Sequence, residues 1–303
     1  YRAFVEKAHA ANCKVAVAAD ILSLTLLTPP GEWGADIVFG TTQRLGTPMF
    51  YGGPSAAYFA TRDEYKRNMP GRIIGWSKDK YGKLCYRMAL QTREQHIKRE
   101  KATSNICTAQ ALLATMAGFY AVYHGPEGIR TIAERIHSIA VFLEKSINRL
   151  GYKQVNVQYF DTLRFALPDT ISAQQIRTIA LSKEVNLRYF KNGDVGMSID
   201  ETTDITAVNV LLSIFAIAAG RDWEKASDVP MASSISAEMK RQSTYLTHEV
   251  FNKYHTETEM MRYIKRLDRK DISLAHSMIS LGSCTMKLNA AAEMLPLSRP
   301  EFM

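Results

Sequence analysis

The sequence predicts an α/β protein in which a layered α/β part is followed by a small α+β domain. The first observation is a set of short, nearly continuous apolar segments, such as Lys14–Ala19 (KVAVAA), which are typical of strands in a parallel sheet covered on both faces. The second is a helical block between residues 109 and 150. The third is a change to short strands separated by helices after residue 150, which is typical of an α+β domain.

The first part of the chain contains a predicted helix and three predicted strands. Residues 2–12 have a helical pattern, and the apolar strand at 14–19 ends at Asp20. The further strands are residues 35–40 (ADIVFG) and 55–60 (SAAYFA). Helix, strand, strand, loop and strand in this order are typical of the later part of an open α/β sheet.

Residues 62–101 are predicted to form a basic, irregular crossing segment. They contain twelve Lys or Arg and five Asp or Glu, so this segment has a net charge of +7, against +8 for the whole chain of 303 residues. Such a local excess suits either small anions or nucleic acid. No nucleic-acid motif is visible and few aromatic residues interleave the cations, so the sequence argues against a nucleic-acid partner.

Two helices are predicted next, at residues 109–123 and 128–150, with the first ending near Gly125-Pro126. The small α+β domain has predicted strands at 154–160, 162–166, 186–190 and 194–199, and predicted helices at 172–183 and 202–219. Residues 221–272 are charged and are predicted to form a helical connector. We therefore expect four parts, at residues 1–105, 106–220, 221–270 and 271–303.

The composition is ordinary for a soluble globular protein, with 46% hydrophobic and 22% charged residues. No stretch approaches the ~20 apolar residues that span a membrane, and no secretory signal is visible. The four cysteines lack metal-ligand spacing, which argues against a zinc cluster and favours a reducing, cytoplasmic compartment. Because the chain begins inside a predicted helix, we expect it to be a piece of a longer protein.

The run Gln91–Thr108 (QTREQHIKREKATSNICT) places cations directly before hydroxyl and amide side chains, and an apolar helical segment follows. A cation-rich segment that leads into a helix N-terminus is an arrangement that receives a phosphate or a carboxylate. The alternative is a solvated loop in which Ser104 or Asn105 caps the helix. The pattern of residue types alone leaves both interpretations open.

Three blocks of sequence make a family resemblance specific. Arg44 lies 24 residues after Asp20, in the first block. The blocks are FGTTQRLGTPMFYGGPSAAYFATRDEYKRNMPGRIIGWSKD, YRMALQTREQHIKREKATSNICTAQALLA and SLGSCTMKLNAAAEM. In these blocks the chain closely resembles the P protein family of the glycine cleavage system. The resemblance covers essentially the whole chain, and it implies a PLP-dependent aminotransferase-type (fold type I) large-domain remainder followed by a small α+β domain.

The resemblance implies an activity for the complete polypeptide. Glycine is decarboxylated with the help of pyridoxal 5'-phosphate (PLP), and the aminomethyl group passes to the lipoyl arm of the H protein. The family's long form has two homologous halves, of which the first has lost the cofactor lysine, and this chain resembles the middle third. The cofactor is then bound covalently outside this fragment. We expect a homodimer or a pairing of the two halves. The alternative is that this chain is a non-catalytic scaffold half that completes a partner's site.

The resemblance also implies roles for individual residues. Arg44 stands at the position of the cofactor lysine, and because a guanidinium offers no free amine, we expect no catalytic residue in this chain and an internal ion pair at Arg44. Thr103 and Ser104 would bind the cofactor phosphate, with Arg99 and His96 supplying positive potential; alternatively these cations only stabilise the interface between halves. The tail residues expected near the substrate are Ser283, Cys284, Thr285, Lys287 and Asn289.

Two further expectations concern the tail block SLGSCTMKLNAAAEM and the histidines. The tail block could instead be a surface segment before a helix. Four histidines without ligand spacing are expected to lie on the surface or to cap helices, namely His124, His137, His248 and His255.

Overall fold

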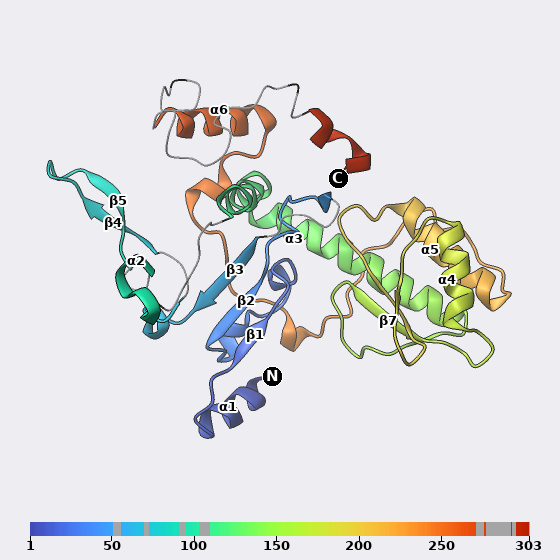
Figure 1. Cartoon of the computed structure of the whole chain (residues 1–303). Helices are drawn as coiled ribbons and strands as arrows, with labels where there is room; N and C mark the ends of the chain where they lie inside the picture. The colour runs from blue at the N-terminus through green and yellow to red at the C-terminus, as the bar shows by residue number, and fades with distance from the viewer. Residues whose placement is uncertain are drawn as a thin grey trace. The chain divides into compact units, whose positions relative to one another are not determined.

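The computed structural model describes residues 1–50, 56–69, 73–90, 95–102, 110–270, 276, 292 and 295–302. The chain forms two compact units, and Figure 1 labels their α-helices and several of their strands. The first unit contains residues Tyr1–Ile21, Pro29–Tyr120 and Asp268–Met303, and the second contains Leu22–Thr28 and Ala121–Leu267. The four-part division expected from the sequence stays a prediction.

The first unit is built on a three-stranded sheet that follows helix α1 (Arg2–Ala10). Strands β1 (Ala16–Ala18) and β2 (Ile37–Thr41) are parallel, and β3 (Ala57–Thr61) is antiparallel to β2. All three predicted strands are therefore confirmed, and the parallel pairing holds for the first two. Since β1 and β2 are parallel, their carboxyl ends meet at one edge of the sheet, where Asp20 and Arg44 follow them.

Asp36 ties helix α1 to the start of the sheet. Its buried carboxylate accepts hydrogen bonds from His9 Nε2 and from the Val15 amide, both at 2.8 Å. Burial alone would raise the pKa of Asp36, but the Val15 amide and His9 outweigh burial and lower it below the ordinary 3.8. The stability that Asp36 contributes is therefore present above pH 3.8 and is lost as the pH falls through the lower folded pKa.

Residues 62–101 are more regular than the sequence suggested, so the prediction of an irregular segment is wrong for part of it. Strands β4 (Ile74–Lys78) and β5 (Leu84–Met88) form an antiparallel hairpin. Its turn is closed by Asp79, whose Oδ1 accepts from the amides of Tyr81 and Lys83 at 2.8 and 2.9 Å. An alternating apolar pattern is present in these strands, but the lysines in and beside the turn conceal it. Helix α2 (Gln95–Lys98) and a 3₁₀ turn at Arg99–Lys101 follow.

Helix α3 (Ala111–Arg149) is interrupted at the position that the sequence predicted. Gly125 has φ 63° and ψ −178°, which no helical residue adopts, and Pro126 follows it. Pro126 lacks an amide hydrogen, so it starts the second segment at little cost. The two predicted helices are thus confirmed as the two segments of α3, broken at a glycine.

The second unit contains an antiparallel sheet in the order β6-β7-β9-β8. Its strands are β6 (Lys153–Gln154), β7 (Thr162–Ala166), β8 (Arg188–Tyr189) and β9 (Val195–Ser198). Helices α4 (Ala173–Ser182) and α5 (Ile205–Ala219) pack against each other (Figure 1). These elements confirm the predicted small α+β domain, although β6 and β8 are shorter than expected. Its core is fully buried at Leu163, Phe165, Ile176, Ile214 and Phe215.

The predicted helical connector is wrong over most of its length. Residues 221–236 contain no helix or strand, short 3₁₀ turns lie at Ala237–Met239 and Glu249–Asn252, and only α6 (Glu257–Asp268) is an α-helix. Ser138 Oγ accepts from the Ala232 amide at 3.0 Å, and Asn209 binds the backbone of Ala226. An isolated bridge joins Leu27 to Lys240. The serines and Pro230 of this segment favour such extended backbone over a helix.

His137 is buried, so the expectation that it lies on the surface or caps a helix is wrong. Its Nε2 accepts from the Ser234 amide at 3.0 Å, and therefore Nδ1 carries the proton that it donates to Phe160 O at 2.7 Å. Burial lowers the pKa of His137 below 6.5, outweighing the Phe160 carbonyl. By contrast, His248 caps a 3₁₀ turn as expected, since its Nδ1 accepts from Val250 N at 3.2 Å.

We expect the second unit to lose stability as the pH falls from 6.5 towards the lower folded pKa of His137, because only the unfolded chain takes up a proton there. The measurement is the urea midpoint between pH 7.5 and 5. In His137→Gln, the pH slope in this window should flatten in part, because burial also lowers the pKa of His124 in the same unit. Asp36 titrates in a separate window below pH 3.8 and so does not interfere. An unchanged slope in the variant would rule out His137 as the group responsible.

Candidate functional site

The structure brings Asp20 and Arg44 together at the carboxyl end of the parallel strands. Arg44 Nη1 donates to Asp20 Oδ2 at 2.7 Å, and the Arg44 and Asp20 side chains are 15% and 34% exposed. The edge where parallel strands end is the usual place for a ligand in an open α/β sheet. The internal ion pair that was expected at Arg44 is thereby confirmed.

A tight backbone turn after β2 positions Arg44. The Leu45 amide donates to Thr42 O at 2.9 Å, and the Thr47 amide donates to Gln43 O at 3.0 Å. Gly46 has φ 88°, and a Cβ there would lie 3.1 Å from the ring of Tyr120. Arg44 lies inside this turn, so the direction of its side chain is set by the backbone.

Tyr58 is a neighbour of the pair that sequence reasoning missed. Its hydroxyl donates to Ala19 O at 2.8 Å. Burial, and then the negative charge of Asp20, raise the pKa of Tyr58, so the phenol stays protonated and able to donate. Gly40 makes room for this contact, since a Cβ there would come within 2.2 Å of Ala19 O and 2.8 Å of the Tyr58 ring. The sequence signal that could have identified Tyr58 was the aromatic residue in SAAYFA, which pairs with Gly40 in the strand register.

The residues at this edge do not fit PLP. A Schiff base needs a free amine, and the delocalised guanidinium of Arg44 provides none. The Asp20 carboxylate, the group that would face a pyridine nitrogen, is ion-paired with Arg44 through Oδ2. The pair is therefore suited to neutralising charge inside the fold, and we assign no catalytic step to it.

The remaining predicted site residues are only partly described. Arg99 is exposed and has a left-handed φ of 52°. His96 lies in α2, and its side chain is outside the described part of the structure. Also outside the described residues are Thr103, Ser104, Ser283, Cys284, Thr285, Lys287 and Asn289. Whether the predicted cofactor-binding and substrate-proximal residues lie close together therefore stays a prediction.

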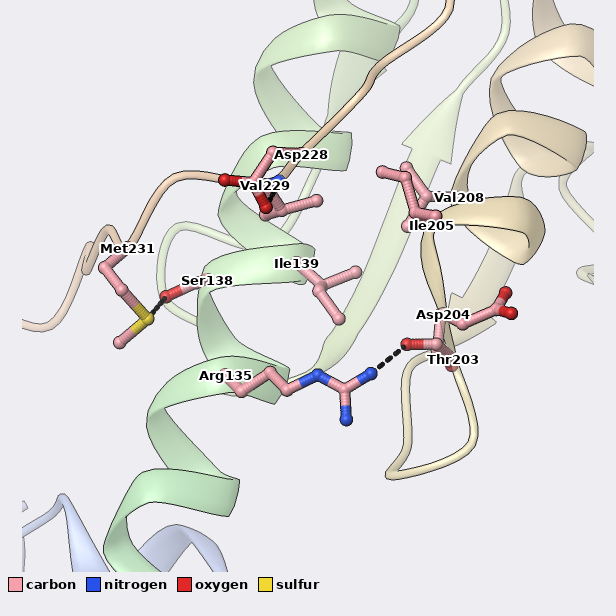
Figure 2. A pocket seen from close by; sticks show the side chains of 10 residues that line it. All are labelled: Arg135, Ser138, Ile139, Thr203, Asp204, Ile205, Val208, Asp228, Val229 and Met231. Carbon is pink, nitrogen blue, oxygen red and sulfur yellow. Dashed lines mark hydrogen bonds between the residues drawn. The ribbon is translucent and has the colours of Figure 1, made fainter.

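A hollow in the second unit lies between α3, the start of α5 and the segment after α5 (Figure 2). Its charged side chains bind nearby backbone. Arg135 Nη2 donates to Thr203 O at 3.2 Å, Asp204 Oδ1 accepts from the Ala207 amide at 2.8 Å, and Asp228 Oδ1 accepts from the Val229 amide at 2.8 Å. The Arg135 bond joins α3 to the turn before α5, whereas the two aspartates bind amides within three residues of themselves, so we interpret the hollow as a structural junction.

Two kinds of feature are absent from the described residues. No group of three or more His, Cys, Asp or Glu among them could hold a metal ion. No helix in the described part of the chain is both long enough and apolar enough to cross a membrane.

Comparisons with solved structures identify the fold. A crystal structure of glycine decarboxylase (P-protein) of the glycine cleavage system, in inhibitor-bound form, matches with a TM-score of 0.67 and 30% identity over 72% of this chain and 51% of that one. A sphingosine-1-phosphate lyase from Burkholderia pseudomallei matches with a TM-score of 0.51 at 13% identity, over 73% of this chain and 48% of that chain. The fold is that of the PLP-dependent fold type I enzymes.

Sequence comparisons identify the family. Proteins named glycine dehydrogenase (decarboxylating) are 87% identical in Bacteroides fragilis over 303 residues and 58% identical in Flavobacterium johnsoniae over 302 residues. Each match covers all of this chain, but the chain spans only 32% and 31% of the relatives' lengths. The sequence model described as "Glycine cleavage system P-protein" matches residues 1–215. The chain therefore belongs to the glycine cleavage system P-protein family.

Proposed function

We propose that this chain is a section of a glycine dehydrogenase (decarboxylating), which uses PLP to decarboxylate glycine and transfers the aminomethyl group to the lipoyl arm of the H protein. The observation that carries the proposal is 87% identity over all 303 residues to a relative with that name. Glycine, the lipoylated H protein and PLP are thus proposed for the longer polypeptide, of which this chain is about a third.

Within that polypeptide, this section does not itself hold the cofactor lysine. The Arg44–Asp20 pair at 2.7 Å supports this, because it occupies the edge of the sheet without offering an amine. We infer that the section is inactive alone and that its fold supports a site built with the rest of the polypeptide, through pairing of two halves or of two subunits. The comparisons give no support to the alternative of a separate scaffold function.

The proposed roles of the motif residues depend on the same assembly. Thr103 and Ser104 would donate hydroxyl hydrogen bonds to the cofactor phosphate, with Arg99 and His96 nearby. Ser283, Cys284, Thr285, Lys287 and Asn289 would lie near the substrate. In the complete enzyme, Thr103→Ala separates the interpretations, since weaker cofactor binding supports a phosphate contact, and normal binding with lost assembly supports an interface role.

The test uses the uninterrupted polypeptide. With lipoylated H protein and PLP, we expect labelled bicarbonate to enter the carboxyl group of glycine, and we expect this exchange to require both additions. Borohydride reduction followed by peptide mapping should place the pyridoxyl-lysine outside residues 1–303. A stoichiometric adduct on a lysine of this chain would contradict the assignment of Arg44. Bound PLP without exchange would keep the fold and reject glycine as the substrate.

A further inference from the structure

The hairpin β4–β5 exposes an apolar face. The register pairs Ile74 with Met88 and Trp76 with Tyr86, so these four side chains and Leu84 lie on the same face of the ribbon. Trp76 and Tyr86 pack edge to face, with ring centroids 6.0 Å apart. Yet Trp76 is 72% exposed and Tyr86 is 74% exposed. We call this set of five side chains the hairpin face.

The described part of the chain leaves the hairpin face uncovered. Among the described elements, neither β4 nor β5 has an extensive contact with any element except its partner strand. A two-stranded hairpin alone is marginally stable at best in water, and a further layer against one face is the usual remedy. The five side chains expose on the order of 600 Å², close to the ~800 Å² that each partner gives to a stable interface. The face is therefore large enough for a permanent contact.

Charge around the hairpin face restricts what can cover it. The hairpin carries Lys78, Lys80, Lys83 and Arg87 but only one acidic residue, Asp79, and all five are exposed. Two copies of such a face would bring like charges together, which is unfavourable. An apolar surface with an acidic rim would satisfy both the apolar side chains and the cations. Charge complementarity thus argues against a second copy of this hairpin.

The length of the relatives indicates which part of the protein covers the hairpin face. The chain spans 32% of a relative that is 87% identical to it, so about two thirds of such a polypeptide lies outside residues 1–303. We propose that the hairpin face is permanently covered by that remaining part of the same polypeptide, through an apolar surface with an acidic rim. This inference rests on the proposed membership of a longer polypeptide, but not on its reaction.

The first test is oxidative footprinting of the uninterrupted polypeptide by hydroxyl radicals, read by mass spectrometry. Tyr81 and Tyr86 are both 74% exposed in this chain, but Tyr81 lies in the turn and not on the hairpin face. We expect Trp76 and Tyr86 to react at least fivefold more slowly than Tyr81. Equal reactivity of the two tyrosines would overturn the proposal, because the face would then be open or its protection would not be specific.

The second test identifies the cover. A carbodiimide joins lysine amines directly to carboxylates, so Lys78, Lys80 or Lys83 should cross-link to Asp or Glu outside residues 1–303. A mixture of ¹⁵N-labelled and unlabelled protein distinguishes the same polypeptide from a second copy. Links within one polypeptide are expected. Links only between copies, or only to residues 1–303, would overturn the proposal.

Variants on the two faces of the hairpin distinguish a lost contact at the hairpin face from a general loss of folding. Trp76→Ser together with Tyr86→Ser should abolish the cross-links, whereas Ser77→Ala on the opposite face should leave them unchanged. Cross-links that persist in the double variant would contradict an apolar contact at the face. Bicarbonate exchange is measured in parallel. Exchange with an unprotected Trp76 rejects this inference alone, and protection without exchange rejects the proposed reaction alone.

Discussion

Gly125→Ala is expected to lower the free energy of unfolding by about 3 kcal/mol or more, because two costs add at this position. The backbone at φ 63° and ψ −178° is accessible almost only to glycine, and strain of this kind costs on the order of 1–3 kcal/mol. The new Cβ would also lie 2.7 Å from His255 Cε1 and 2.8 Å from Phe251 O. The histidine ring can move, but the carbonyl belongs to backbone.

The control for this variant lies in the same helix. Gly118 is exposed, and a Cβ there would meet nothing within 4 Å. Gly118→Ala should therefore be neutral or should stabilise by up to about 1 kcal/mol, since alanine favours a helix interior. Both variants are compared by urea denaturation. A loss below 1 kcal/mol in Gly125→Ala, or equal effects of the two substitutions, would mean that α3 does not need the break at Gly125.

The second large effect is expected at Asp20 and Arg44. Asp20→Asn should destabilise by about 2 kcal/mol, between the 0–1 kcal/mol of an exposed ion pair and the 3–5 kcal/mol lost when a buried pair is broken. The reason is that the Arg44 side chain is only 15% exposed and loses the carboxylate that neutralises it. Arg44→Gln in the same background should restore part of the loss, because the largely buried guanidinium that has lost the Asp20 carboxylate is then removed.

A double-mutant cycle measures this coupling. We expect about 1–2 kcal/mol between Asp20 and Arg44. The control pair is Lys66–Asp63, which has the same 2.7 Å separation but side chains that are 48% and 86% exposed. Its coupling should be below ~0.5 kcal/mol, because water screens exposed charges. Equal couplings for the two pairs would show that burial does not strengthen the Arg44 interaction.

Elements whose apolar pattern, capping residue and terminating residue lie within one short stretch were predictable from the sequence. Helix α5 combines a long apolar run with an Asp204 cap, whose Oδ1 accepts from Ala207 N at 2.8 Å, and with a left-handed Gly220 at its end. The break in α3 was marked by Gly125-Pro126. In each case one short stretch of sequence both forms and limits the element, so no distant partner was needed to predict it.

Elements that depend on distant partners were not predictable in the same way. The segment after Gly220 was predicted to be helical from its charge, but bonds to Ser138 and His137, more than 90 positions away, hold it extended. His137 itself gave no sign of burial in the sequence. At the candidate site, an internal ion pair at Arg44 was expected from the resemblance, but its partner Asp20 was identified only by the structure. Tyr58 depends on the strand register and was missed.

The bridge between Leu27 and Lys240 has a consequence for synthesis on the ribosome. Leu22–Thr28 belongs to the second unit, but its hydrogen-bond partners are synthesised much later. Arg241 Nη1, for example, donates to Leu24 O across 217 positions. At a translation rate of ~5–20 residues per second, this early segment waits on the order of 10–40 s for Arg241 to be made. A nascent chain that stalls before residue 241 therefore leaves the carbonyls of Leu24 and Leu26, the acceptors of Arg241, open to water.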